Sequence, residues 1–282
     1  MNAADLSAIL TRRSGSNFYY SFLFLPRRQR HAIYALYAFC RTVDDAVDQG
    51  AATPIEQRRT LAEWRLELAR AYDGSPTQPI AQHLAEVVRA FPVQRQHLEA
   101  ILDGVEMDID KRRYATFEEL HEYCYRVAAA VGLACIEIFG YTDPRARDYA
   151  MNLGIALQLT NILRDLRTDA ERGRIYLPLD EIRRFGYSED ELLHGRHTPA
   201  FVGLMRSQAD RAHAYYRAAK AALPSADRRR LVAAEIMGRI YRALLREIEA
   251  REFRVFNDRI RVSTSRKIAI AFGAYLHGQL AP

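Results

Sequence analysis

A row of polar side chains inside an apolar stretch constrains this chain more than any other feature of its sequence. Residues 153–166 are rich in leucine, isoleucine and alanine and predict a buried helix. Because helical neighbours lie three and four residues apart, four polar side chains share one face of this helix: Gln158, Asn161, Asp165 and Asp169. A buried unpaired carboxylate is costly, so the row requires a cation or strong hydrogen-bond donors beside it.

A second acidic row lies far upstream and matches the first. Asp44 and Asp48 are again one helical turn apart, and Val43 and Val47 beside them are apolar. Two helices that each contain such a pair can face each other across a bundle and hold a divalent metal. Their oxygen ligands suit Mg²⁺, which completes its shell with water and phosphate oxygens. Iron and manganese carboxylate bundles typically add a Glu-x-x-His motif. Neither pair has one nearby, so Mg²⁺ with a phosphorylated ligand is favoured.

Arg41 and Tyr37 precede the first acidic row on the same predicted helix. They lie one turn apart, and Arg41 lies one turn before Asp45, so both can reach one phosphate group. Arginine donors and metal ions stabilise the negative charge that develops on a departing diphosphate. The alternative for Arg41 is an ion pair with Asp45 or Asp48, and the two roles are compatible.

The composition favours a large helical domain. Of the 282 residues, 49% are hydrophobic, and only 14 are glycine and 10 proline. Helices are therefore favoured over strands, and we expect one all-α domain over residues 1–282. The net charge of +6 favours an anionic partner. Nucleic acid ranks low among such partners because no basic block with interleaved aromatic residues is found.

Cysteines and apolar runs bear on the cellular compartment. The 3 cysteines have no CxxC spacing, which indicates free thiols in a reducing cytoplasm rather than a disulfide framework or a zinc site. The N-terminal segment lacks the apolar core of a signal peptide, and no apolar run reaches membrane-spanning length. We therefore expect a cytoplasmic protein, and peripheral contact with the inner membrane stays open.

Apolar periodicity and turn residues divide the chain into helices. Residues 116–119 have the spacing of a capping box and open a helix that is predicted to run unbroken to residue 140. No alternating strand pattern of useful length is found. The predicted helices cover 27–41 with a continuation into the first acidic row, 55–72, 80–90, 93–110, 117–140, a helix from 144 into the second acidic row, 181–185, 188–194, 199–223, 227–253 and a short last segment.

Several stretches between residues 14 and 178 form a pattern when they are taken together. They are Ser-Gly-Ser-Asn-Phe-Tyr-Tyr (14–20), Tyr-Ala-Phe-Cys-Arg-Thr-Val-Asp-Asp-Ala-Val-Asp (37–48), Tyr-Cys-Tyr-Arg-Val-Ala-Ala-Ala-Val-Gly (123–132), and Leu-Gln-Leu-Thr-Asn-Ile-Leu-Arg-Asp-Leu-Arg-Thr-Asp (157–169) followed by Gly-Arg-Ile-Tyr-Leu-Pro (173–178). In residues, order and spacing this pattern resembles the squalene/phytoene synthase family of head-to-head prenyltransferases.

The resemblance implies an isoprenoid synthase fold, which is a single-domain helical bundle with a deep central cavity. Two C15 or C20 allylic diphosphates would bind in this cavity with Mg²⁺. The metal ligands that it implies are Asp44, Asp48, Asn161, Asp165 and Asp169. The residues that it places at the substrate and its diphosphate are Ser16, Asn17, Phe18, Tyr37, Arg41 and Ala129, again with Asn161.

The resemblance also implies roles near the reacting carbons. Tyr123 corresponds to a tyrosine proposed as acid or base, and Gln158 would lie near the reaction centre with Arg41. Many relatives have Val-Ala-Gly where this chain has Val-Ala-Ala, so Ala129 adds a methyl group at a helix-packing or pocket position. For Ser16 and Asn17, capping of the next helix is the commoner alternative.

The product is predicted from the N-terminal motif. This motif, Ser-Gly-Ser-Asn-Phe-Tyr-Tyr-Ser-Phe-Leu-Phe-Leu-Pro, most resembles bacterial presqualene diphosphate synthases of hopanoid biosynthesis. We therefore expect the chain to condense two farnesyl diphosphates to presqualene diphosphate. Downstream enzymes of the hopanoid pathway are the expected protein partners. Phytoene synthase, which takes two geranylgeranyl diphosphates, is the alternative. An NADPH-dependent squalene synthase is less favoured, because no dinucleotide fingerprint is found. A different class, an inactive assembly-factor homologue, is disfavoured because both acidic pairs are intact.

Overall fold

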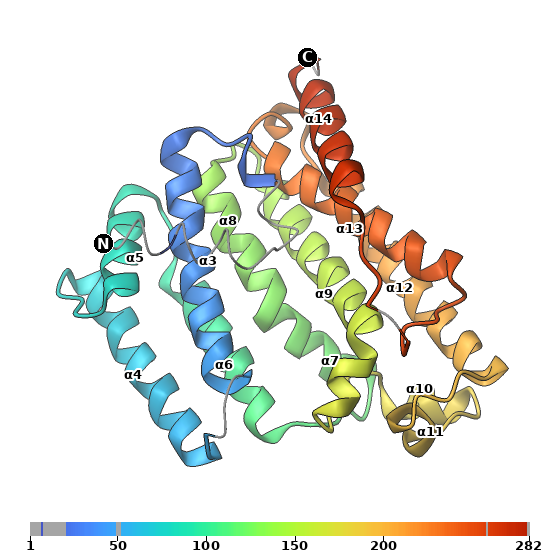
Figure 1. The fold of residues 1–282 in the computed structure, drawn as a ribbon. Coiled ribbons are helices and arrows are strands. Elements are labelled where there is room, and N and C mark those ends of the chain that lie inside the picture. The colour runs from blue at the N-terminus through green and yellow to red at the C-terminus, as the bar shows by residue number, and fades with distance from the viewer. Residues whose placement is uncertain (1–6, 8–20, 49–51, 258, 281–282) are drawn as a thin grey trace.

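The residues that the computed structural model describes, 7, 21–48, 52–257 and 259–280, fold into helices (Figure 1). Among them the only β pairing is an isolated bridge, so the predicted all-α class is confirmed. In chain order the elements are α3 (Arg27–Asp48), α4 (Pro54–Asp73), α5 (Pro79–Ala90), α6 (Arg95–Asp110), α7 (Phe117–Cys124), the π-helix η1 (Tyr125–Ala129), α8 (Ala130–Phe139), α9 (Arg145–Glu171), α10 (Leu179–Arg184), α11 (Glu189–Leu193), α12 (Pro199–Ala222), the 3₁₀ turn η2 (Ser225–Asp227), α13 (Val232–Ala250) and α14 (Thr264–Leu280).

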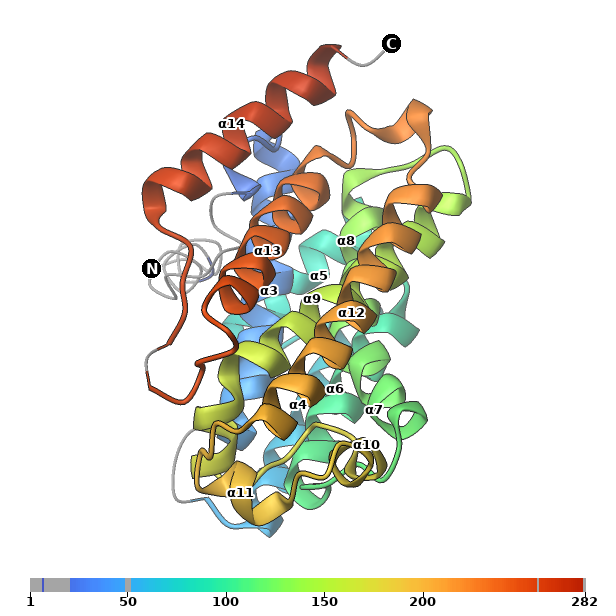
Figure 2. The ribbon, with the colours of Figure 1, turned by 90° about the vertical axis from the view of Figure 1, so that its right-hand side faces the viewer.

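The two helices with the acidic rows lie on different sides of the bundle. α3 contains the first row and packs against α4, α5 and α6, whereas α9 contains the second row and packs against α12 and α13. α8 contacts both α3 and α9, and Figure 1 shows it between them. Figure 2 shows α14 running across the bundle beside α13, its main packing partner. The acidic rows are thus held on two separate groups of packed helices.

α3 has a buried face that fixes which residues point into the bundle. Apolar side chains recur along it at helical spacing, and Leu36, Phe39 and Val43 are fully buried. Phe39 packs edge-on against Trp64 of α4, with ring centroids 5.9 Å apart. Because this face packs on α4, the neighbouring face of α3, which contains Tyr37 and Asp44, borders the same cavity as α9.

The predicted unbroken helix over residues 117–140 is wrong, because the structure divides it. A turn of π-helix, η1, separates α7 from α8. Glycines of the flanking helices lie against this turn: a Cβ at Gly104 of α6 would lie 2.7 Å from Val127 Cγ1, and one at Gly154 of α9 would lie 2.7 Å from the Ala128 carbonyl oxygen. Such bulges are frequent at functional sites, and this one borders the cavity described below.

Two further local predictions are corrected by hydrogen bonding. The Thr116 side chain makes no capping hydrogen bond to α7, and Glu119 accepts from the Ala115 amide instead. The predicted helix start at Asp227 is replaced by η2, and α13 begins five residues later. Asp227 is fully buried and accepts hydrogen bonds from the amides of Thr142 and Asp143. The side chains of Glu119 and Asp227 therefore stabilise loops rather than helix ends.

The expectations on cysteines and membrane spans can also be compared with the structure. Cys40, Cys124 and Cys135 are free thiols, as predicted. Within the described residues, we find no helix with both the length and the apolar character that crossing a membrane requires.

Candidate active site

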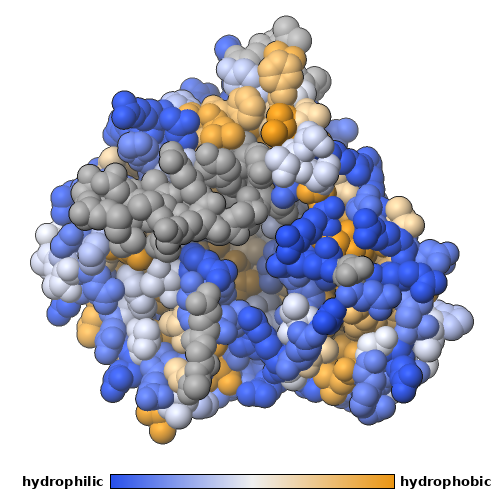
Figure 3. Space-filling view, in the orientation of Figure 1, coloured by the Kyte–Doolittle hydropathy of each residue, from blue (hydrophilic) through white to orange (hydrophobic). Residues whose placement is uncertain are grey.

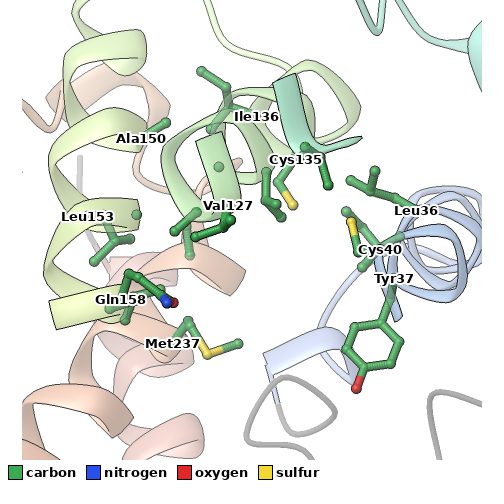
Figure 4. Close-up of a pocket in the computed structure, with 18 of the residues that line it drawn as sticks. Leu36, Tyr37, Cys40, Val127, Cys135, Ile136, Ala150, Leu153, Gln158 and Met237 are labelled. Carbon is green, nitrogen blue, oxygen red and sulfur yellow. The ribbon is translucent and has the colours of Figure 1, made fainter. Parts of the chain in front are cut away.

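A cavity of about 320 Å³ opens between the two acidic helices. Its walls come from α3, α6, α7, η1, α8, α9 and α13, and most of the lining is apolar. In Figure 4, Leu36 and Cys40 of α3 lie across the open space from Val127 of η1 and Leu153 of α9. Figure 3 shows apolar side chains in the depth of a hollow on this face, with hydrophilic residues around it. The predicted central cavity is therefore confirmed.

One region of the cavity is polar and brings distant parts of the sequence together. It includes six residues that the sequence singled out: Tyr37, Arg41, Asp44, Tyr123, Gln158 and Asn161. They come from α3, α7 and α9, so a site that is spread over more than a hundred residues of sequence is assembled by the packing of three helices.

Arg41 forms the ion pair that was the alternative to phosphate binding. Its Nη2 lies 2.6 Å from Asp45 Oδ1, and its Nε donates a hydrogen bond of 3.1 Å to Asp45 Oδ2. A weaker contact of 3.7 Å joins Arg41 Nη1 to Asp44 Oδ2. Asp45 therefore orients the guanidinium, and because Arg41 also lines the cavity, the pairing is compatible with contact to an anionic ligand.

Asp48 is held by arginines that follow the second acidic row. Arg172 and Arg174 each donate a hydrogen bond of 2.7 Å, one to each carboxylate oxygen of Asp48. Arg174 also donates to the backbone oxygen of Asp108 over 3.3 Å. These contacts connect the C-terminal end of α3 to the loop after α9, so they bring the ends of the two acidic rows toward each other.

The polar row on α9 is only partly satisfied by protein contacts. Asp165 accepts hydrogen bonds from Arg164 and lies 3.3 Å from Arg259 Nη2. Asn161 Nδ2 donates to Gln158 Oε1 over 3.3 Å. The Asn161 Oδ1 atom is buried and has no hydrogen-bond partner among the described residues. A buried acceptor in this state favours a ligand or a cation beside it.

Asp108 of α6 is a central residue of the site that was not predicted from the sequence. It lines the cavity and accepts hydrogen bonds from Tyr123 (2.9 Å) and from Tyr176 (2.7 Å). Burial is the main cause that raises its pKa to about 6, and the Asp48 carboxylate acts in the same direction. Residues 103–110 contain several acidic residues at mixed spacing, so the sequence offered no signal that separates Asp108 from its exposed neighbours.

Asp108 acts electrostatically on both acidic rows. Burial and then repulsion from Asp48 raise the pKa of Asp44 to about 7, and Asp108 adds to the rise. Burial and then repulsion from Asp165 raise the pKa of Asp169 to about 7, and Asp108 again contributes. Carboxylates that destabilise each other's charged forms make a site where a cation is favourable.

These donors fit a metal ion that is shared with a ligand. No group of three or more His, Cys, Asp or Glu side chains among the described residues is close enough to hold a metal alone. The orphaned Asn161 oxygen and the mutually repelling carboxylates nevertheless match Mg²⁺, which usually takes one or two carboxylates together with water and phosphate oxygens. The residues that could hold it are those that the sequence predicted, with Asp108 beside them.

Tyr123 lies in a cluster of tyrosines next to Asp108. Its ring stacks on Tyr176 at a centroid distance of 5.1 Å and lies 5.5 Å from the ring of Tyr114. Burial, with the Asp108 charge second, raises the pKa of Tyr123 well above its usual value. The phenol is therefore protonated at neutral pH and acts as a hydrogen-bond donor to Asp108 rather than as a ready acid or base.

Ala129 takes the helix-packing position, one of the two that its sequence allowed. It is fully buried, and a Cβ on Gly154 of α9 would lie 2.7 Å from its Cα. The neighbouring Ala128 lines the cavity. The predicted residues Ser16, Asn17 and Phe18 lie outside the described residues.

Comparisons with known proteins agree with this architecture. A solved dehydrosqualene synthase with a bound ligand superposes with a TM-score of 0.86 and 30% identity over 98% of this chain and 96% of that protein. Squalene synthase HpnC from Alicyclobacillus acidocaldarius gives a TM-score of 0.80 and 29% identity over 89% of this chain and 94% of that one. The phytoene synthase of Arthrospira platensis is 37% identical, with 94% of this chain and 89% of the relative covered. The 15-cis-phytoene synthase of Synechocystis is also 37% identical, with 99% of this chain and 86% of the relative covered.

The names of these relatives correct one prediction from the sequence. The expected synthesis of presqualene diphosphate from farnesyl diphosphate in a hopanoid pathway is wrong, because the similar curated proteins of cyanobacteria and plants are phytoene synthases. The family-level prediction is confirmed. The model of the squalene/phytoene synthases matches residues 11–266, and this chain belongs to that family of prenyltransferases.

Proposed function

We propose that this chain is a phytoene synthase, which condenses two molecules of geranylgeranyl diphosphate head to head in the presence of Mg²⁺. The observation that carries the proposal is the 37% identity to cyanobacterial phytoene synthases over nearly the whole chain. The solved dehydrosqualene and squalene synthases share the fold at a lower identity of 30% and 29%. Sequence similarity therefore favours the phytoene reaction over the activities named for the structural neighbours.

The proposed reaction balances without a reductant. The first substrate loses diphosphate with its bonding electron pair, and the C2–C3 double bond of the second substrate attacks the allylic cation. A proton is lost as the cyclopropyl diphosphate forms. Departure of the second diphosphate and of one more proton leaves a hydrocarbon. No hydride is transferred, so the proposed reaction does not require NADPH.

The polar region of the cavity supplies groups for the diphosphate. Mg²⁺, when bound by Asp44, Asp48, Asn161, Asp165 and Asp169, would neutralise charge on the leaving diphosphate. Arg41, oriented by Asp45, donates to the same group. The protonated Tyr123 donates its hydroxyl hydrogen to Asp108 and holds that carboxylate in place at the edge of the cavity.

The apolar lining supplies the second requirement, which is the exclusion of water. An allylic cation that meets water is quenched as an alcohol, so the walls must be dry. Side chains such as Ile33, Leu36 and Leu153 line the cavity beyond its polar region. Gln158 lines the cavity and accepts a hydrogen bond from Asn161. Its amide would lie near the reacting carbons of the bound substrates.

Product analysis tests the proposal directly. The full chain is incubated with Mg²⁺ and either geranylgeranyl or farnesyl diphosphate, with and without NADPH, and hexane extracts are analysed by mass spectrometry. We expect a C40 hydrocarbon from geranylgeranyl diphosphate, independent of NADPH and abolished by EDTA. Turnover of farnesyl diphosphate alone would overturn the phytoene assignment.

We further propose that α14 contacts an anionic membrane, into which a hydrocarbon product can partition. Ile268, Phe272 and Leu276 are exposed large apolar side chains one turn apart on this helix, and Figure 3 shows apolar side chains at the corresponding end of the molecule. α14 has no acidic residue, and Arg266 is exposed in its first turn. An exposed apolar face with basic residues and no acidic ones is typical of helices that lie in the membrane interface.

A further inference from the structure

A second cavity lies on the other side of the wall of the first. It has a volume of about 300 Å³ and is bordered mainly by α12 and α13. Tyr149 and Leu153 of α9 line both cavities. These two side chains therefore form a wall between the candidate reaction chamber and a separate space that none of the assignments above uses.

The second cavity has a strong excess of positive charge. Lys220, Arg228, Arg239 and Arg242 line it, and Glu235 is its one acidic lining residue within the described chain. Glu235 lies 3.5 Å from Arg239, its neighbour one helical turn away. The other three cations have no ion pair with a described residue. Cations that converge on a concave surface without carboxylate partners favour an anionic ligand.

Two buried hydrogen-bond donors at this cavity lack acceptors. Arg228 Nε and the Tyr149 hydroxyl are buried and have no hydrogen-bond partner among the described residues. Burial and then the charge of Glu235 raise the pKa of Tyr149 well above its usual value, so the phenol is a neutral donor close to the charged residues of α13. A buried donor without an acceptor is destabilising, and an oxygen-rich ligand would remove that penalty.

We propose that this second cavity binds a phosphate-bearing anion, with Arg228, Arg242 and the Tyr149 hydroxyl as its donors. Guanidinium groups match phosphate oxygens in geometry and charge. The volume suits inorganic phosphate, diphosphate or the phosphate of a lipid head group. Because Tyr149 also lines the first cavity, a bound anion holds the shared wall. The inference does not depend on which isoprenoid the chain condenses.

Binding measurements on the full chain without Mg²⁺ test the site. Isothermal titration calorimetry uses inorganic phosphate and then diphosphate, and flotation uses phosphatidylglycerol vesicles against neutral phosphatidylcholine vesicles. The test variant is Arg228→Gln/Arg242→Gln. The matched control is Arg206→Gln/Arg217→Gln, which removes two exposed cations of α12 that have no ion pair with a described residue. Arg41→Gln reports on binding in the reaction cavity.

We expect the wild type, the α12 control and Arg41→Gln to bind the anion with equal affinity. The test variant should bind it at least about tenfold more weakly, because hydrogen bonds between charged groups are strong. Tyr149→Phe, which keeps the wall, should also weaken binding while the melting temperature is retained. Binding of free phosphate or diphosphate identifies a soluble anion. Binding of phosphatidylglycerol vesicles alone identifies a lipid head group when the test variant loses it and Ile268→Ser/Phe272→Ser, which changes only the exposed face of α14, keeps it. Undetectable binding, equal binding by the test variant, or binding that only Arg41→Gln abolishes would overturn the proposal.

Discussion

The Tyr123 hydroxyl donates a hydrogen bond of 2.9 Å to Oδ2 of Asp108, and this contact joins the aromatic part of the site to its acidic part. The other oxygen of Asp108 accepts from Tyr176 over 2.7 Å. Asp108 also raises the pKa of both Asp44 and Asp169, so it lies within electrostatic range of both acidic rows. One buried carboxylate thus connects motifs that are separate in the sequence.

Asp108→Asn tests this connection. The amide oxygen can still accept from one tyrosine, so we expect the fold to be kept while kcat falls about 10- to 100-fold, as is common when a residue that orients metal or substrate groups is changed. Turnover and the thermal melting curve are measured together. Asp110→Asn on the same helix is the control, because Asp110 is exposed and pairs with Arg58 at the surface. Equal activity in both variants would remove Asp108 from the site.

Asp165→Asn tests the metal assignment on α9. The amide preserves shape and can accept one of the two hydrogen bonds from Arg164, but it removes the charge that a divalent cation requires. We expect a folded protein with at least about a hundredfold lower turnover and a raised Mg²⁺ requirement. Glu171→Gln, an exposed carboxylate two residues beyond Asp169, should retain wild-type turnover. If Asp165→Asn also retained it, the metal assignment would be wrong.

Gly154→Ala tests the close contact between α9 and η1. The new methyl group would lie 2.7 Å from the Ala128 carbonyl oxygen and from Ala129 Cα, both backbone atoms. We expect a loss of about 1–3 kcal/mol in the free energy of unfolding, because overpacked backbone cannot yield easily. Gly273→Ala on α14 is the matched control, since its methyl group would meet nothing within 4 Å. It should be neutral or stabilise the helix by up to about 1 kcal/mol. Chemical denaturation of both variants and the wild type measures these changes in the free energy of unfolding.

Glu67→Gln tests a pH-dependent contribution to stability. Burial acts to raise the pKa of Glu67, but hydrogen bonds from Thr77, Gln78 and Arg70 outweigh it and lower the pKa to about 2. A carboxylate whose pKa falls on folding stabilises the protein above its unfolded pKa, and this stabilisation is lost as the pH falls through the folded value. At pH 7 we expect Glu67→Gln to cost about 1–3 kcal/mol, since amide donors lose their charged acceptor.

The difference in unfolding free energy between the wild type and Glu67→Gln should therefore be constant above about pH 4.5 and shrink from there toward pH 2. Urea denaturation at several pH values measures it. A difference that does not change over this range would show that the charge of Glu67 is not what stabilises the loop after α4.

Ile268→Ser/Phe272→Ser tests the membrane contact of α14. We expect the variant to float poorly with phosphatidylglycerol vesicles while its melting temperature is unchanged, because both side chains are more than half exposed. Ile55→Ser/Leu66→Ser removes two apolar side chains of α4 that are even more exposed, and it is the control. Equal flotation of both double variants argues against the contact. A changed oligomeric state in the α14 variant would instead identify this face as an interface between copies of the chain.

Local sequence was sufficient to predict most helices. Apolar periodicity and breaks such as the loop over 73–79 depend on neighbouring residues, so α3, α4 and α9 were predicted close to their observed bounds. The π-turn η1 was not predictable, because it lies against Gly104 and Gly154 on helices that are distant in sequence. The start of α13 was missed for the same reason, since Asp227 bonds to the loop at Thr142 and not to its own helix.

The candidate site divides in the same way. The sequence alone determined the two acidic rows and their family, because spacing within one helix decides which side chains share a face. Only the tertiary structure decided that Asp108 and Tyr176 belong with Tyr123 and that Arg172 and Arg174 hold Asp48, since these residues meet only when α6, α7 and the loop after α9 pack together. Contacts between elements far apart in the chain depend on the shape of the whole core, which no local pattern encodes.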